Sequence, residues 1–140
     1  MVSLEGEARG VFSRYSDILS SSRLDVEEAV EVGGGEARVM AGEGGVLPRV
    51  EGAVDHLAFL VSDRSVIPPR KEVRVVIEST DPKEDIANLS KLVRLYSERA
   101  QLRALGVLVC DKVTDEMMTC VQGLEDVEVV CITREALERV

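Results

Sequence analysis

Apolar residues in the first half of the chain change from helical to strand-like spacing. Over residues 3–21 they recur every three or four positions, which predicts an amphipathic helix. Residues 26–32 and 37–41 are β-like runs separated by Gly33 to Gly35. Three glycines favour a hairpin turn here, because glycine adopts positive φ at little cost. The apolar stretch from Val50 to Ser62 predicts a third strand.

The middle of the chain predicts a buried strand followed by a long helix. Residues 73–77 are rich in β-branched side chains, which indicates a central strand covered on both faces. Asp81 and Pro82 suit the N-cap and the first position of a helix. We expect this helix to extend to about residue 104 and Gly106 to break it.

The last third alternates short strands with short helices. Residues 107–109 predict a strand, and Thr114 is expected to cap a helix that Gly123 closes. Residues 127–132 predict the final strand, and residues 133–140 a short terminal helix.

The predicted order is α-β-β-β-β-α-β-α-β-α. Short strand–helix–strand crossovers imply parallel pairing, whereas the hairpin implies antiparallel pairing. We therefore expect one α/β domain over residues 1–140, with a mixed central sheet flanked by helices on both faces.

The acidic balance of the chain bears on its partners. The formal net charge is −9, which opposes tight non-specific binding of nucleic acid, because phosphate neutralisation supplies most of that affinity. A nucleic-acid partner would need a local basic patch, so a protein partner or a homodimer fits better. No apolar run approaches the ~20 residues of a membrane span, and the first residues lack the pattern of a signal peptide. We expect a cytoplasmic protein without membrane contact.

The three cysteines do not predict a metal or disulfide framework. Cys110, Cys120 and Cys131 include no C-x-x-C pair, and the one histidine, His56, lies far from them in sequence. A structural zinc site needs about four nitrogen or sulfur ligands, usually in close pairs. Buried packing is the expected role of these cysteines.

Candidate catalytic and metal-binding residues lie at the end of the central strand. Glu78, Ser79 and Thr80 follow its apolar core, and Asp55 lies near the start of the hydrophobic part of the preceding strand. This pattern resembles the restriction-endonuclease-like, or PD-(D/E)XK, nuclease superfamily, and the archaeal and RecB-like branches look most similar. In those, an aspartate on one strand precedes a hydrophobic strand that ends in Glu-x-Lys and is followed by a helix. The resemblance covers about residues 3–132.

The resemblance implies a set of metal ligands. Asp55 and Glu78 match the two metal-binding acids, and Glu7 in the first predicted helix matches an accessory glutamate of some branches. Carboxylates at adjacent strand ends suit Mg²⁺, which prefers oxygen ligands and keeps several waters for attack on phosphate. Mg²⁺ is therefore the cofactor implied if the protein is active, and none is expected otherwise.

Two positions depart from the family pattern. Thr80 stands where the catalytic lysine is expected, and a neutral hydroxyl neither acts as a base near pH 7 nor stabilises phosphate charge well. Leu92 stands where RecB-like members carry a glutamine, four residues before Tyr96. The cations on the same predicted helix that are candidates for replacing the lysine are Lys83, Lys91 and Arg94.

Each candidate also has a structural interpretation. An acid such as Glu78 at a strand end is more often a solvated or capping residue than a metal ligand, and Asp55 is explained equally well by a hydrogen bond to a neighbouring turn. His56 points to the opposite strand face from Asp55 and suits the core, as does Tyr96 on the apolar helical stripe.

Three functions are therefore compatible with the sequence. The preferred one is a nuclease-fold protein that has lost catalysis and acts as a binding or structural partner in DNA metabolism. The second is an active Mg²⁺-dependent DNA endonuclease. The third is an unrelated α/β regulatory module that dimerises through its sheet edge.

Overall fold

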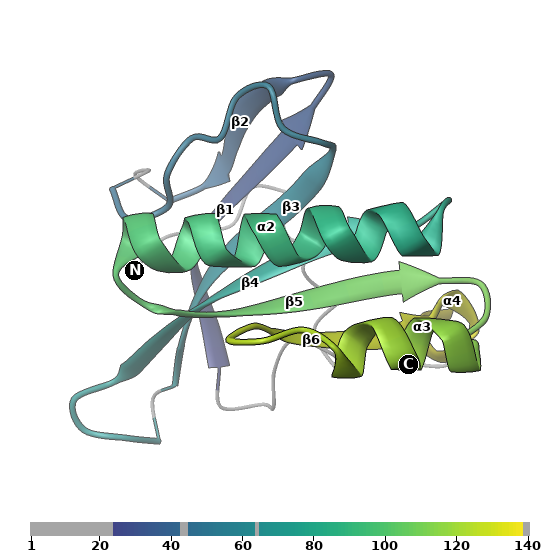
Figure 1. Ribbon diagram of the computed structural model, residues 1–140. Helices are drawn as coiled ribbons and strands as arrows, with labels where there is room; N and C mark the ends of the chain where they lie inside the picture. Colours follow the sequence, from purple (N-terminus) through teal and green to yellow (C-terminus); the bar gives the residue numbers. More distant parts are fainter. Residues whose placement is uncertain (1–23, 43–44, 64, 139–140) are drawn as a thin grey trace.

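The computed structural model describes residues 24–42, 45–63 and 65–138, in which six strands form one sheet accompanied by three helices (Figure 1). The strands are β1 (Leu24–Gly33), β2 (Glu36–Ala41), β3 (His56–Asp63), β4 (Arg70–Glu78), β5 (Arg103–Cys110) and β6 (Glu128–Thr133). The helices are α2 (Pro82–Ala100), α3 (Asp115–Gln122) and α4 (Arg134–Glu138). The helix expected over residues 3–21, which contains Glu7, lies outside the described residues.

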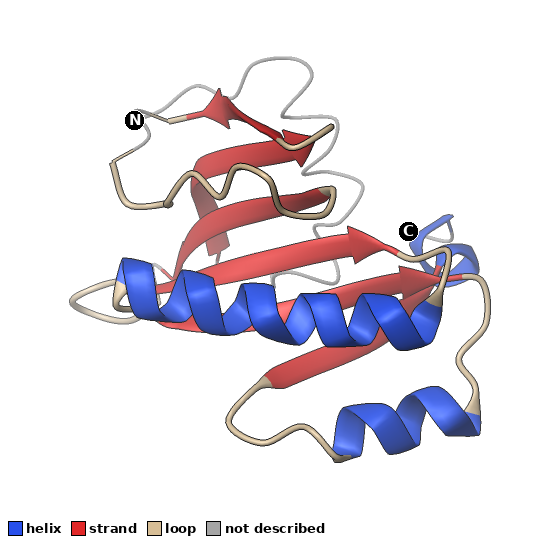
Figure 2. Ribbon diagram, turned by 45° about the horizontal axis from the view of Figure 1, so that its top comes forward, coloured by secondary structure: helices blue, strands red, loops and turns tan. Residues whose placement is uncertain are grey.

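The sheet is mixed, as expected from the order of elements. Its strands follow the order β2-β1-β3-β4-β5-β6. The pairs β1–β2, β1–β3 and β3–β4 are antiparallel, whereas β4–β5 and β5–β6 are parallel. Helices α2 and α3 are the crossovers that parallel pairing requires, and α2 lies against one face of the sheet, roughly along β5 (Figure 2). No helix in the described ranges is long and apolar enough to cross a bilayer.

The hairpin and the central strand agree with the sequence prediction. Gly34 and Gly35 have φ of 59° and 81° in the β1–β2 turn, which explains why glycine occupies these positions. Strand β4 lies between β3 and β5, and Val75 and Val76 are at most 1% exposed on opposite faces. The caps of α3 are also confirmed, since the Thr114 hydroxyl accepts a hydrogen bond from the Met117 N–H and Gly123 is the C-cap.

The predicted boundaries of β3, α2 and β5 are wrong. Strand β3 begins at His56 and not at Val50, because Val50 enters the core from a loop in which Gly52 has a φ of 82°. Helix α2 ends at Ala100, because Gln101 adopts a left-handed conformation with φ of 56°. The expected helix breaker, Gly106, lies inside β5.

The core divides into two clusters on opposite faces of the sheet. The larger contains the buried residues of α2, Met117 of α3 and alternate residues of β3, β4 and β5. The smaller consists of strand residues, among them Phe59, Val76, Val107 and Val109. Helices α2 and α3 therefore share one face of the sheet.

A buried carboxylate anchors the loop that follows β2. Glu28 of β1 is 7% exposed, and its two carboxylate oxygens accept hydrogen bonds from the backbone N–H groups of Gly45, Val46 and Leu47 at 2.9 to 3.1 Å. A buried carboxylate is stable only when it is hydrogen-bonded in this way. The anchor holds Leu47, 4% exposed, in the core beside α2.

Replacing Glu28 by glutamine should lower the free energy of unfolding by about 1 to 3 kcal/mol, because an amide NH₂ would face a backbone donor. Chemical denaturation would measure the change. The control is Glu36→Gln at the exposed start of β2, which should have little effect. Equal losses in the two variants would contradict the anchor.

Helix α2 packs tightly against β5 at Gly106. A Cβ atom added to Gly106 would lie 2.9 Å from Leu89 Cγ and 2.9 Å from Val93 Cγ2. Both neighbours are buried core residues, so neither can move away easily. The absence of a side chain at Gly106 therefore sets the spacing between helix and sheet.

Gly106→Ala should destabilise the protein by about 1 to 3 kcal/mol, the usual range for overpacking a core. Equilibrium unfolding in urea would measure it. Gly33→Ala is the matched control, because a Cβ at this strand glycine meets nothing within 4 Å. A stable Gly106→Ala variant would show that α2 can shift away from the sheet.

Candidate functional site

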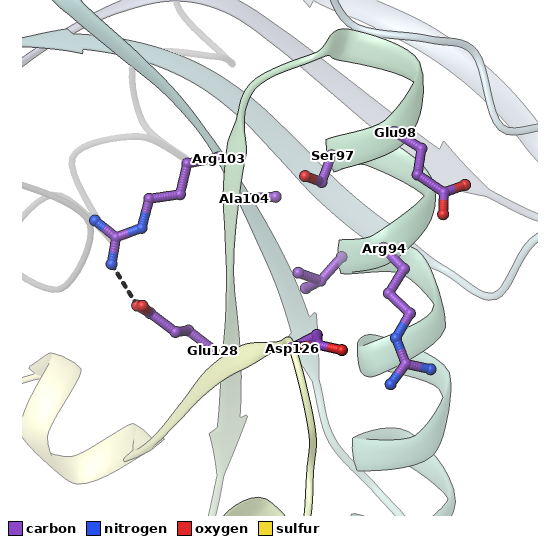
Figure 3. Close-up of a pocket in the computed structure, with 8 residues that line it drawn as sticks. Arg94, Ser97, Glu98, Arg103, Ala104, Asp126 and Glu128 are labelled. Atoms are coloured by element: carbon purple, nitrogen blue, oxygen red, sulfur yellow. Dashed lines mark hydrogen bonds and ion pairs between the residues drawn. The ribbon is translucent and has the colours of Figure 1, made fainter.

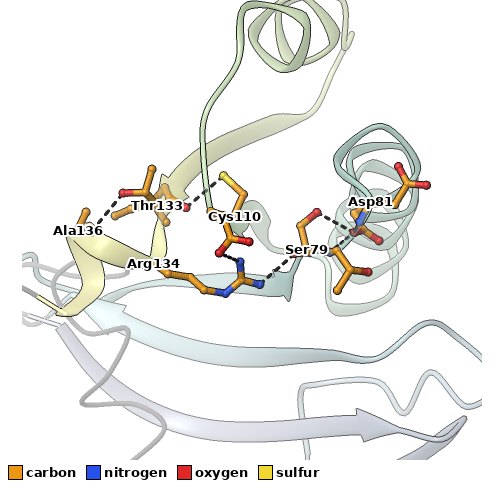
Figure 4. A network of polar contacts seen from close by, with 10 residues as sticks. Ser79, Asp81, Cys110, Thr133, Arg134 and Ala136 are labelled. Carbon is orange, nitrogen blue, oxygen red and sulfur yellow. Dashed lines mark hydrogen bonds and ion pairs between the residues drawn. The ribbon is translucent and has the colours of Figure 1, made fainter.

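The carboxyl ends of the three parallel strands meet at one edge of the sheet. Glu78 pairs with Val109, and Cys110 pairs with Thr133, so β4, β5 and β6 end side by side. Ligands of open α/β sheets usually bind outside the carboxyl ends of parallel strands. This edge, which we call the strand-end edge, is shown in Figure 4.

Asp55 and Glu78 lie near each other in the topology of the sheet. The last pair of the β3–β4 ladder is Leu57 with Val76, and the two acids each lie two positions beyond it, Asp55 just before β3 and Glu78 as the last residue of β4. Both acids are exposed. Glu78 ends β4, at the strand end where the resemblance puts the second acid, whereas Asp55 lies just before β3. Glu7 lies in the part of the chain that is not described.

Asp55 makes the turn contact that the sequence analysis named as the alternative to metal binding. It precedes β3 and is exposed, so the expectation of an aspartate inside an apolar strand is wrong. Its Oδ1 accepts a hydrogen bond of 3.0 Å from the backbone N–H of Gly34. Asp55 thereby stabilises the β1–β2 turn.

The segment after Glu78 is organised by a carboxylate of α2. Asp85 Oδ2 accepts hydrogen bonds from the Ser79 hydroxyl at 2.7 Å and from the backbone N–H groups of Thr80 and Asp81 at 3.0 Å each (Figure 4). Asp81 is the N-cap residue, as predicted, but its side chain makes no capping hydrogen bond. Asp85, in the first turn of the helix, instead binds the N–H groups of the N-cap residue and of the residue before it, similar to the reciprocal half of a capping box, and its charge is favourable at a helix N-terminus.

Arg134 joins the strand-end edge, and the sequence analysis did not identify it. Its Nη1 donates to Asp111 Oδ1 at 2.6 Å and its Nη2 donates to the Ser79 carbonyl at 2.9 Å (Figure 4). One guanidinium thus links the ends of β4 and β5 to the start of α4. The available signal was weak: an arginine two residues after the last predicted strand.

Two of the three cations proposed to replace the lysine contact α3 or the loop that follows it. Lys83 Nζ lies 3.4 Å from Glu116 Oε2 of α3, and both side chains are at least 70% exposed. Arg94 Nη2 donates to the Glu125 carbonyl at 3.1 Å. Lys91 is exposed, and Leu92, at the expected glutamine position, is part of the buried core.

A pocket of about 420 Å³ lies at the opposite end of the parallel strands, between α2 and the beginnings of β5 and β6 (Figure 3). Its lining residues are Val93, Arg94, Ser97, Glu98, Arg103, Ala104, Asp126 and Glu128. Arg103 donates to Glu128 at 2.6 Å and to Glu72 at 3.2 Å, and the hydrogen bond with Glu128 is the largest cause of its raised pKa. The Ser97 hydroxyl donates to the Leu102 carbonyl. The Ser97 hydroxyl and the Arg103–Glu128 pair, which line the pocket, are therefore already hydrogen-bonded within the protein.

His56 and Tyr96 form a buried polar pair between β3 and α2. The His56 Nδ1 lies 2.6 Å from the Val54 carbonyl and must donate to it, so Nε2 accepts from the Tyr96 hydroxyl at 2.7 Å. Burial lowers the pKa of His56 and raises that of Tyr96. Both residues belong to the core, as the sequence predicted.

Among the residues described, no group of three or more histidine, cysteine, aspartate or glutamate side chains could hold a metal ion. Asp55 and Glu78 are the described residues that the resemblance assigns to Mg²⁺. No protein-family model matches the chain, and comparison with curated proteins and with solved structures also gives no match.

The burial of His56 predicts that the folded protein loses stability in acid. An unfolded chain protonates His56 below its ordinary pKa of 6.5, whereas the folded protein resists protonation to a lower pH. The contribution of His56 to stability should therefore be complete above pH 6.5 and decline as the pH falls through the folded-state pKa. The free energy of unfolding, measured between pH 7.5 and about 5 in the native protein and in His56→Gln, would show this decline. The variant should lose less stability over this interval, and parallel curves would contradict the assignment.

Proposed function

We propose that this protein has a nuclease-type fold without catalytic activity and acts by binding a partner, as a structural component of DNA metabolism. The observation that carries the proposal is the Asp85 contact. The segment that would present a Glu-x-Lys motif is folded around an α2 carboxylate, which accepts hydrogen bonds from Ser79, Thr80 and Asp81.

Charge at the strand-end edge supports a loss of catalysis. Phosphoryl transfer requires cations or metal ions where negative charge develops. Thr80 is neutral, and the nearby Arg134 already binds Asp111 and a main-chain carbonyl. The net charge of −9 adds general repulsion of a phosphate backbone.

The second candidate is an active Mg²⁺-dependent DNA endonuclease. It is favoured by the position of Asp55 and Glu78 at the same end of adjacent strands, and Arg134 would then supply the cation in place of lysine. This candidate requires metal to bind between the two acids although Asp55 Oδ1 already accepts the Gly34 N–H.

Incubation with plasmid and branched DNA in Mg²⁺ or Mn²⁺ separates the two candidates. We expect no cleavage by the native protein and, at physiological salt, DNA binding no tighter than the ~10⁻⁴ M of weak non-specific complexes. Glu84→Ala, at an exposed acid of α2, is the control for Glu78→Ala. Metal-dependent cleavage that Glu78→Ala abolishes and Glu84→Ala retains would establish the endonuclease instead.

Thr80→Lys tests whether the fold keeps the geometry of the nuclease site. The substitution changes an exposed side chain and leaves its backbone N–H available to Asp85. Cleavage gained by Thr80→Lys and removed again by adding Glu78→Ala would support descent from an active enzyme.

A further inference from the structure

Strand β6 forms one edge of the sheet, and no described residue pairs with its outer side. Its four central residues, Val129 to Ile132, carry no charge and include no proline. Val130 is 43% exposed. The ladder with β5 runs from Leu105–Glu128 to Cys110–Thr133 without a shift in register, so the edge is regular over the whole strand.

The opposite edge of the sheet differs in these respects. Strand β2 carries Glu36 and Arg38, both exposed, and its ladder with β1 shifts register between Ala29 and Val30. Charges and bulges on an edge strand prevent it from pairing with other chains, and natural proteins use both for this purpose. Strand β6 has neither between residues 129 and 132.

We infer that β6 pairs antiparallel with β6 of a second copy of this chain, about a two-fold axis at Cys131. In this arrangement the charges that flank the strand are complementary. Glu128 begins β6, and Arg134 follows β6 as the first residue of α4, three positions before and three positions after Cys131. Glu128 of one copy therefore lies at the same end of the interface as Arg134 of the other. Val130 then faces Ile132 of the second copy. The interface is self-complementary, as a two-fold dimer requires.

The existing contacts of the flanking charges are compatible with this pairing. Glu128 already binds Arg103, and Arg134 already binds Asp111, through atoms at the ends of long side chains. Each end of the interface therefore carries an acidic residue of one copy and a basic residue of the other, and the ion pairs within each copy are kept. The inference does not depend on the proposed function, because it concerns backbone pairing at an edge distant from β3 in the sheet order.

Sedimentation equilibrium over a concentration series tests the dimer. The native protein should dimerise reversibly, and Val130→Lys should raise the dissociation constant about tenfold, because two symmetry-related Val130–Ile132 pairs are lost. Met118→Lys is the matched control, since Met118 on α3 is 41% exposed but not on the edge. Circular dichroism would confirm that both variants are folded.

Cross-linking tests the register on the native protein, so the result does not depend on the folding of a variant. Copper phenanthroline would oxidise the two Cys131 thiols that meet across the axis to a disulfide. Two electrons and two protons would pass to dioxygen. The covalent dimer should disappear in Cys131→Ser and persist in Cys120→Ser. A protein that stays monomeric up to about 1 mM, a dimer unaffected by Val130→Lys, or a dimer without the Cys131 cross-link would overturn the inference.

Discussion

The close contact between helix α2 and strand β5 determines the arrangement of the other elements. Only a glycine fits beneath Leu89 and Val93, so Gly106 fixes the depth at which the helix lies on the sheet. This depth allows Tyr96 to reach His56 on β3 and places Asp85 beside the end of β4. The buried polar pair and the strand-end edge therefore both depend on one helix position.

The protein secures its irregular segments with carboxylates bonded to backbone N–H groups. Glu28 holds the loop after β2, Asp85 holds the turn before α2, and Asp55 holds the hairpin between β1 and β2. Each bond satisfies a main-chain donor that no regular ladder or helix would satisfy. Part of the excess of acidic residues thus has a structural role, whichever partner the protein binds.

Local signals in the sequence predicted most elements. The glycine run, the β-branched residues of β4 and the Thr114 cap act within a few residues of each other, and all of them lead to the observed structure. The end of α2 was missed because Gln101, not a glycine, takes the left-handed conformation. Val50 was assigned to a strand because burial in a loop leaves the same apolar signal as burial in a sheet.

The candidate site was less accessible to sequence reasoning. Asp55 and Glu78 were placed at adjacent strand ends by pattern alone, and the ladder register agrees. Arg134 could not be found, because its partners are 23 and 55 residues away. The role of Asp85 had a local signal, an acid four residues after the N-cap, that could have been read as a cap.

The Glu28 anchor has a consequence for how the loop can evolve. Within the described part of the chain, the hydrogen bonds of this carboxylate go to backbone N–H groups of residues 45–47, so they do not distinguish among the side chains there. Val46, 38% exposed, can therefore vary widely while the loop keeps its path. Proline is the exception, because it alone lacks the N–H that the carboxylate binds. The loop can thus acquire new surface chemistry without any change in the fold beneath it.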